Sequence, residues 1–291
     1  MFNQLVVSGL TTGSIYALIA LGFSITFTST KILNFAHGEM VMLGALLGVT
    51  FFSVLQLPYL VAMALIMVFV GTIAILFERL VLHPIMSRGG HTHNLIISTL
   101  AAAFFISNAA ELLWGKDDLY ARPPFGNEPI AFLGANFIPQ SFLVFAVTIL
   151  FLFATWFFYE KTMMGRSFRA VAINREAASL MSINVKRVMM LTLGLSGVLA
   201  AVSGFAFSPI TNANAFIGMP LGVKGFAAAL IGGLTSSRGS VAGGFLLGFF
   251  EVFCSGYISS GYKDALAFTA LLLVLFLKPA GLFVSSRGIS E

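Results

Sequence analysis

Charged side chains are scarce in this chain. Asp, Glu, Lys and Arg make up 9% of its 291 residues, whereas apolar residues make up 58%. About a quarter of the residues of a typical soluble domain are charged. The scarcity therefore excludes a soluble globular protein and indicates an all-α polytopic membrane protein. No stretch outside the apolar runs is long enough for a soluble domain, so we expect a single transmembrane domain over residues 1–291.

Residues for covalent, metal or nucleotide chemistry are also missing. Cys254 is the only cysteine and lies in an apolar run, which leaves it without a disulfide partner. His83, His91 and His93 share a polar loop that has no carboxylate or thiolate to complete a metal site. The chain has no G-x-x-x-x-G-K-[ST] motif and no Ser/His/Asp set. We expect no catalytic residue, no metal and no cofactor bound by the chain itself.

The remaining charge belongs to loops. The first 28 residues contain no Lys or Arg, so they predict a retained first span rather than a cleaved signal. The net charge of +5 comes from loops beside spans, which makes nucleic acid an unexpected partner and membrane lipid an expected one.

Apolar runs of membrane-spanning length predict about 8–10 transmembrane segments. A window of about 20 residues is needed to cross a bilayer as an ordinary helix. The seventh run is too short for that, so the count of nine holds to within one. The predicted spans are Leu5–Thr28, Phe35–Leu55, Tyr59–Leu82, Asn94–Trp114, Ser141–Phe158, Val188–Phe207, Gly222–Thr235, Ser240–Tyr257 and Leu266–Leu282.

Basic residues predict the orientation, because Lys and Arg next to a span end are retained in the cytoplasm. The loop 83–93, the segment 160–187 and the C-terminal end with Lys278 and Arg287 read as cytoplasmic. The loop 115–140 then lies outside, together with the N-terminus.

The segment 160–187 holds six of the sixteen Lys and Arg residues. Asn174 is a suitable N-cap, and Glu176 would follow in the first turn, where a negative charge is favoured. Ala177, Leu180 and Met181 then share one side of a short helix. This spacing predicts a helix along the membrane face with a small, apolar side for a partner. The alternative is a solvated positive loop with incidental helicity.

Glycine interrupts the apolar runs at two places. The segment Asn34–Glu39 joins an amide, His37, Gly38 and a carboxylate, and a Gly- and Ser-rich stretch with Gly232, Gly233, Arg238 and Gly239 follows the seventh run. Irregular backbone at membrane depth is tolerated only inside protein or along a wet cavity. The two stretches therefore predict broken helices that line a substrate path.

Other polar residues admit simpler explanations. Glu78, Arg79, Glu111 and Lys224 fall near span ends, where interfacial solvation accounts for them. Glu251 lies deeper, and it is either a functional carboxylate or one paired with groups of a neighbouring helix. The glycine pairs with small-xxx-small spacing, such as Gly44/Gly48, predict close helix packing.

Several stretches resemble a known family. They include NFAHGE at Asn34–Glu39, MGRSFRAVAINREAASLMSINVKRV at Met164–Val188 and KPAGLF at Lys278–Phe283. They look like the LivH-type membrane permease of branched-chain amino acid ABC importers, and the likeness covers nearly the whole chain. It implies the ABC importer permease fold, a bacterial inner-membrane location, a LivM-type second permease, two ATP-binding subunits that hold the ATP, and a periplasmic substrate-binding protein.

The resemblance also implies roles for residues. The permease coupling motif, Glu-Ala-Ala followed by a glycine, is matched at Glu176, Ala177 and Ala178, but Ser182 stands in the glycine's place. The expected ATPase-coupling residues are Gly165, Arg166, Arg169, Glu176, Ala177, Ala178, Leu180 and Ser182.

The expected mechanism is alternating access driven by partner ATPases. Substrate would pass Asn34, His37, Gly38, Glu39, Gly232, Gly233, Arg238 and Gly239. The substrate is a branched-chain amino acid or a related amide or acid. The rival reading is a secondary transporter or channel working alone, with Glu39, His37 and Glu251 as a charge relay. A non-transporting scaffold explains neither the broken helices nor the basic helix.

Overall fold

The computed structural model describes residues 2–89, 92–126, 128, 130–132 and 135–283. Within these residues the chain is almost entirely helical, with one short antiparallel hairpin in which Ile130 faces Phe137. The elements are α1 Phe2–Thr30, α2 His37–Gly48, the π-helix η1 Val49–Val54, α3 Tyr59–Phe77, the π-helix η2 Glu78–Leu82, α4 His83–Ser87, α5 Thr92–Trp114, β1 Ile130–Phe132, β2 Ala135–Phe137, α6 Pro139–Lys161, α7 Met163–Ile173, α8 Arg175–Leu180, α9 Val185–Thr211, α10 Gly218–Gly232, α11 Ser237–Tyr257, η3 Ser260–Tyr262 and α12 Lys263–Leu277.

The described part of the chain has eight helical segments long and apolar enough to cross a membrane. They correspond to eight of the nine predicted spans. The predicted seventh span is the shorter helix α10, which has 15 residues. The prediction of an all-α membrane protein with about 8–10 segments, one of them too short for an ordinary crossing, is confirmed.

Two predicted boundaries are wrong. The third span continues through η2 and α4 to Ser87, so the predicted loop 83–93 begins later than expected. The last helix ends at Leu277 rather than Leu282. Pro279 explains that end, because proline lacks an N–H and disfavours helix in the residue before it. The chain then turns back, and the Leu282 amide donates to the Ile231 carbonyl at the end of α10.

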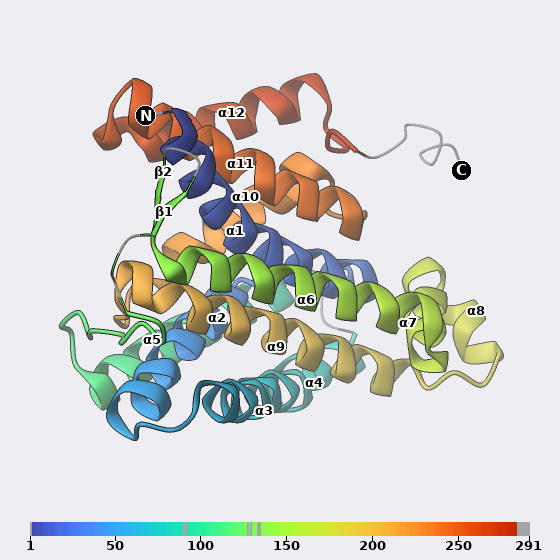
Figure 1. Cartoon of the computed structure of the whole chain (residues 1–291). Helices are drawn as coiled ribbons and strands as arrows, with labels where there is room; N and C mark the ends of the chain where they lie inside the picture. The colour runs from blue at the N-terminus through green and yellow to red at the C-terminus, as the bar shows by residue number, and fades with distance from the viewer. Residues whose placement is uncertain (1, 90–91, 127, 129, 133–134, 284–291) are drawn as a thin grey trace.

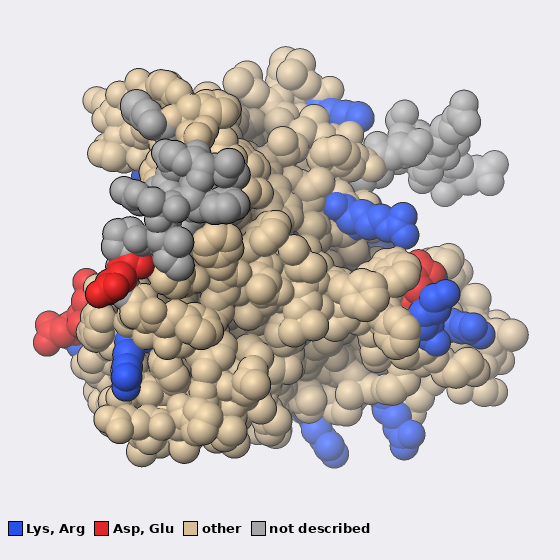
Figure 2. All heavy atoms as spheres, viewed as in Figure 1, with Lys and Arg blue, Asp and Glu red and all other residues tan. Residues whose placement is uncertain are grey.

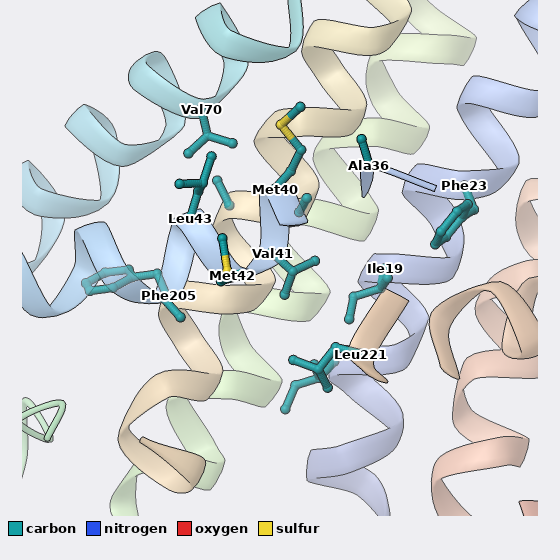
Figure 3. Close-up of a cluster of buried hydrophobic side chains, with 14 of the residues drawn as sticks. Ile19, Phe23, Ala36, Met40, Val41, Met42, Leu43, Val70, Phe205 and Leu221 are labelled. Atoms are coloured by element: carbon teal, nitrogen blue, oxygen red, sulfur yellow. The ribbon is translucent and has the colours of Figure 1, made fainter. Parts of the chain in front are cut away.

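Small residues bring the helices of the bundle together. A Cβ on Gly248 of α11 would collide with Gly13 of α1, and one on Gly44 of α2 would lie 2.6 Å from Ala201 Cα in α9. The predicted role of the glycine pairs in close packing is confirmed. Around these contacts lies a buried apolar core formed by α1, α2, α3, α9 and α10 (Figure 3).

The bundle has two distinct ends (Figure 1). Helices α7 and α8 lie at one end, which we call the α8 end, and the N-terminus and the β hairpin lie at the other, the N-terminal end. The last turn of α1 reaches the α8 end, where the Arg175 guanidinium donates to the Ser29 carbonyl at 2.9 Å. In Figure 2 the charged side chains lie toward the two ends, and the band between them is apolar or uncharged. This distribution fits a protein that crosses a membrane along its long axis.

Candidate translocation path and coupling helix

The chain between α1 and α2 runs back into the bundle. The His37 ring at the start of α2 lies with Nε2 3.2 Å from the carbonyl oxygen of Ile19. Ile19 precedes the end of α1 by eleven residues, or about 16 Å at 1.5 Å per residue. Residues 31–36 are therefore non-helical backbone inside the membrane part, and α2 starts within the bundle. The predicted break at Asn34–Glu39 is confirmed as a helix break.

Polar groups at this break are held by neighbouring backbone and side chains. The Asn34 Oδ1 accepts a hydrogen bond from the Ala36 amide at 3.1 Å, which satisfies one of the free amides before α2. His37 Nδ1 lies 3.0 Å from Ser196 Oγ of α9, and its ring packs edge-on against Phe23 of α1 at 4.6 Å between centroids. His37 thus fixes the start of α2 between α1 and α9.

The next two residues face α10. A Cβ on Gly38 would meet the Gly218 carbonyl and would lie 2.8 Å from Gly222 Cα. The Glu39 side chain is buried against Gly218, and its Oε2 has no hydrogen-bond partner among the described residues. Glu39 borders a cavity of about 480 Å³ between α2, α5 and α10. The α2 half-helix and the short helix α10 therefore meet backbone to backbone.

The second predicted break is the turn between α10 and α11. Gly233 has φ +106°, a conformation that favours glycine, and a Cβ on Gly239 would meet the Gly232 carbonyl. Ser236 caps α11 by accepting from the Gly239 amide at 3.1 Å. Exposed Arg238 borders a cavity of about 630 Å³ that also contacts Arg169 of α7. This turn lies at the α8 end.

The structure does not bring the two breaks together. They lie at opposite ends of α10, whose 15 residues span about 21 Å. The start of α10 contacts Gly38 and Glu39, and its last residue, Gly232, contacts Gly239. Helix α10 therefore connects the two sets of predicted path residues.

The predicted short helix of the basic segment is α8. Asn174 Oδ1 accepts from the Ala177 amide at 3.0 Å, so the predicted N-cap is confirmed. Ala177 is exposed, and Leu180 and Met181 are 85% and 78% exposed. The predicted apolar side of the helix therefore faces outward. Ile173, which ends α7 two residues before α8, is 86% exposed as well. We call Ile173, Ala177, Leu180 and Met181 the α8 surface.

Ser182 adopts the conformation in which a glycine is favoured. Its φ is +62°, in the left-handed region. The Ser182 amide donates to the Ser179 carbonyl, and the Ile183 amide donates to the Ala178 carbonyl, which is the Schellman arrangement of a helix C-terminus. The C-terminus of α8 requires a positive φ at this position. Serine adopts that conformation at an energetic cost that glycine would avoid.

Other predicted coupling residues have different surroundings. Ala178 is buried in a small core with Phe168 and Val188, so it fixes α8 to α7 and α9. Gly165 is buried where a Cβ would meet the Phe158 carbonyl. Arg169 forms an ion pair of 2.8 Å with Glu160. Exposed Arg166 contacts Met163 Sδ at 3.9 Å. Among the predicted coupling residues, Ala177 and Leu180 lie on the α8 surface.

Sequence reasoning missed the role of Arg175. Its Nε and Nη2 both donate to the Ser29 carbonyl, at 3.2 and 2.9 Å. A cation at the C-terminus of a helix is favourable, because the last carbonyls have no partner within the helix. No local pattern identifies this bond, since Ser29 lies 146 residues away in sequence. The bond joins α8 directly to the last turn of α1.

Two predicted interfacial anchors are largely shielded from solvent instead. Glu78 is 3% exposed within η2. The Lys224 side chain is 13% exposed and pairs with Glu251 at 2.6 Å. Both predictions counted distance from the span end, whereas packing of neighbouring helices decides exposure. Glu251 does pair with a neighbouring helix, because Tyr16 of α1 donates its hydroxyl to Oε2 at 2.8 Å.

The long apolar helices of the described residues place the chain among integral membrane proteins of many spans. Residues 5–276 match the family described as the branched-chain amino acid transport system permease component. The chain belongs to this family, as the resemblance predicted.

Several characterised proteins are similar to the chain. It is 32% identical to the high-affinity branched-chain amino acid transport system permease protein LivH of Salmonella typhimurium, over 97% of this chain and 95% of that one. It is 33% identical to the corresponding protein BraD of Pseudomonas aeruginosa, with the same coverage. A solved structure of PsaBC from Streptococcus pneumoniae in complex with Fab aligns over 94% of this chain and 91% of that one, with 13% identity and a TM-score of 0.48.

Proposed function

We infer that the chain is the permease subunit of an ATP-binding-cassette importer for branched-chain amino acids or a related small amide or acid. The observation that carries this inference is the α8 surface. A capped helix with exposed apolar side chains is joined through Arg175 to the helix that leads into the break at Asn34. A transporter that works without partner subunits has no use for an exposed apolar surface at the end of its bundle.

The partners follow from what the chain does not supply. Its sequence has no phosphate-binding loop, so two ATP-binding subunits provide the energy, and they hold the ATP. One ATP-binding subunit holds the α8 surface in a groove. The groove of the other ATP-binding subunit holds the corresponding surface of a LivM-type second permease. A periplasmic binding protein delivers the substrate at the N-terminal end. The chain itself is a transport subunit and not an enzyme.

The orientation follows from the basic residues. The α8 end carries Arg166, Arg169, Arg175, Lys186 and Arg187, and retained basic residues mark the cytoplasmic side. The N-terminal end then faces the periplasm of the bacterial inner membrane, and the C-terminus is cytoplasmic. In a Cys254→Ser background, a cysteine at exposed Lys186 should react with an impermeant thiol reagent only after the inner face is opened. A cysteine at exposed Tyr262 should react in intact cells.

The contacts suggest how closure of the ATPase subunits reaches the path. Movement of α8 displaces the end of α1 through the Arg175–Ser29 bonds. Residues 31–36 follow, and they carry the start of α2, where Gly38 touches α10. Close-packed helices transmit such displacements because a packed interface changes between discrete arrangements. The contact between α2 and α10 is thus the element that opens and closes.

Copurification and uptake test the function together. The tagged chain, expressed with its genomic partners, should bring ATP-binding subunits with it. Vesicles of that complex should take up labelled leucine only with ATP and binding protein present, with urea and benzoate as competitors. Uptake that persists without ATP, or a chain that purifies alone in active form, would favour the secondary transporter or channel and end the importer assignment.

A further inference from the structure

A second group of charged side chains lies inside the bundle, away from the coupling helix. Lys224 of α10 forms ion pairs with Glu251 of α11 at 2.6 Å and with Asp264 of α12 at 2.7 Å. Tyr16 of α1 donates its hydroxyl to the other oxygen of Glu251 at 2.8 Å. We call these four residues the Lys224 cluster. It joins four helices near the N-terminal end.

The cluster borders a cavity of about 540 Å³ between α1, α9, α10 and α11. Tyr16, Lys224 and Glu251 form one wall, and Lys263 and Asn214 lie at the cavity as well. The rest is mostly apolar and includes Phe207, Ile217, Leu221 and Val252. The volume is in the range of small-molecule sites, which combine apolar walls with a few placed polar groups.

The cavity lies below the N-terminal end of the bundle. Glu251 is six residues before the end of α11, or about 9 Å from that end, and it pairs with Lys224 of α10, whose first residues contact Gly38 and Glu39 inside the bundle. In the orientation proposed above, the cavity is on the side from which a binding protein releases substrate.

Burial of this ion pair needs an explanation beyond packing. The Lys224 and Glu251 side chains are only 13% and 7% exposed. Removing two charges from water is costly, and apolar residues of similar volume are often at least as stabilising in such positions. Ionisable residues within membrane spans commonly mark a substrate pathway.

The bonding of the cluster leaves capacity for a ligand. A lysine ammonium has three N–H donors, and Lys224 uses two of them for Glu251 and Asp264. Each carboxylate oxygen accepts two hydrogen bonds, and each oxygen of Glu251 accepts one within the cluster. One cationic donor and several anionic acceptors therefore remain at the cavity wall.

Lys224, Lys263 and Glu251 line the cavity, and Asp264, which does not line it, forms an ion pair with Lys224, so these four charges together sum to zero. A ligand with a net charge would leave an uncompensated charge in a medium of low dielectric, which is unfavourable. A ligand with both charges and no net charge avoids that cost. Aromatic acids carry a net charge, and neutral urea and simple amides avoid the cost but offer no charged group to the free Lys224 donor or to the Glu251 carboxylate.

We propose that this cavity is a transient acceptor site for a zwitterionic α-amino acid with an apolar side chain. The third N–H of Lys224 binds the ligand carboxylate, Glu251 receives the ligand ammonium, and the apolar walls receive the side chain. The proposal rests on the import function above and narrows its substrate class to amino acids.

Thiol protection tests the site directly. Ser255 borders the same cavity, so a Ser255→Cys variant in the Cys254→Ser background places one reactive group there. In the intact complex without binding protein, leucine should slow labelling of this cysteine several-fold. Leucinamide, which is only a cation, and 4-methylpentanoate, which is only an anion, should slow it much less. Equal protection by all three, or by none, would overturn the proposal.

A charge-free pair separates binding from structure. The double variant Lys224→Met with Glu251→Gln removes both shielded charges together and leaves only Asp264, whose side chain is 56% exposed, without its partner, so the complex should assemble. Protection by leucine should be lost. The matched control is Lys116→Met with Glu111→Gln, an ion pair of 3.1 Å outside this cavity whose side chains are 75% and 25% exposed, and it should leave protection unchanged. Retained protection in the Lys224 double variant would make the cluster a structural clamp only.

The outcomes also separate this site from the transport function. ATP-dependent uptake by the wild-type complex without any protection by leucine would reject the site and leave the importer. Protection by leucine together with uptake that does not depend on ATP would support the amino acid site and contradict the importer function.

Discussion

The contact between α2 and α10 and the surface of α8 use small residues for opposite purposes. At the first, Gly38 lies against Gly218 and Gly222 with no space for a methyl group. At the second, Ala177 is exposed and leaves room outside the chain. In the membrane interior a small residue allows two helices of this chain to touch, whereas on α8 it would allow another chain to approach. A substitution should therefore change packing at the first region and association at the second.

The largest effect is expected at Gly38. In Gly38→Leu the side chain would have to enter the space of the Gly218 carbonyl and Gly222 Cα, and overpacking commonly costs about 1–3 kcal/mol or more. Uptake should be abolished while ATP-binding subunits still copurify. The control is Gly261→Ala, because no atom lies closer than 3.8 Å to its added Cβ. Wild-type uptake by Gly38→Leu would place the moving contact elsewhere.

Ala177→Arg on the α8 surface should disrupt association with the ATP-binding subunits rather than packing within the chain. A long charged side chain on the α8 surface cannot be buried in an ATPase groove without a partner. The ATP-binding subunits should be lost from the purified complex, with the permease still present in the membrane. Glu176→Gln is the control, since it removes only a first-turn charge worth about 0.3–1 kcal/mol to the helix. Normal copurification of Ala177→Arg would return α8 to a solvated segment.

Arg175 connects the two regions, so its loss should separate them. Arg175→Met removes both bonds to Ser29 and leaves the α8 surface intact. We expect bound ATP-binding subunits and continued ATP hydrolysis, with uptake reduced several-fold. Arg175→Lys should restore part of the uptake, because one donor still reaches the carbonyl. Arg187→Met, at an exposed arginine of the same segment that is not among the expected coupling residues, serves as the control. Equal ratios of uptake to hydrolysis in the Arg175→Met variant and the wild type would contradict the link.

The smallest effect is expected at Ser182. Ser182→Gly removes the steric cost of a positive φ at the C-terminus of α8, roughly 1–2 kcal/mol for a non-glycine residue. Glycine's larger entropy in the unfolded chain offsets part of that gain, so a small net stabilisation of the helix end is expected. Slower hydrogen exchange of the Ser182 and Ile183 amides would report it, because both close the helix end. Ser179→Gly, in the interior of the same helix, should speed exchange instead.

Local patterns were sufficient for much of the fold. The scarcity of charge indicated membrane spans, and the short seventh run predicted the short helix α10. Asn174 as an N-cap and the glycine break before α2 were also predicted, because a cap and a break depend on residues a few positions apart. The positions of helix ends were less accurate, as the extension to Ser87 shows.

Contacts between distant segments were decided only by the tertiary structure. Lys224 looked like an interfacial anchor because its partner Glu251 is 27 residues away on another helix. The bonds of Arg175 to Ser29 cross 146 residues, and no spacing rule reaches that far. The two glycine breaks were predicted to line one path, but α10 holds them about 21 Å apart. The sequence by itself determined where the chain is helical and where it breaks, since backbone preferences act locally. Only the packing of the bundle decided which charged side chains pair with each other, because the partner of a shielded charge is supplied by whichever helix lies beside it.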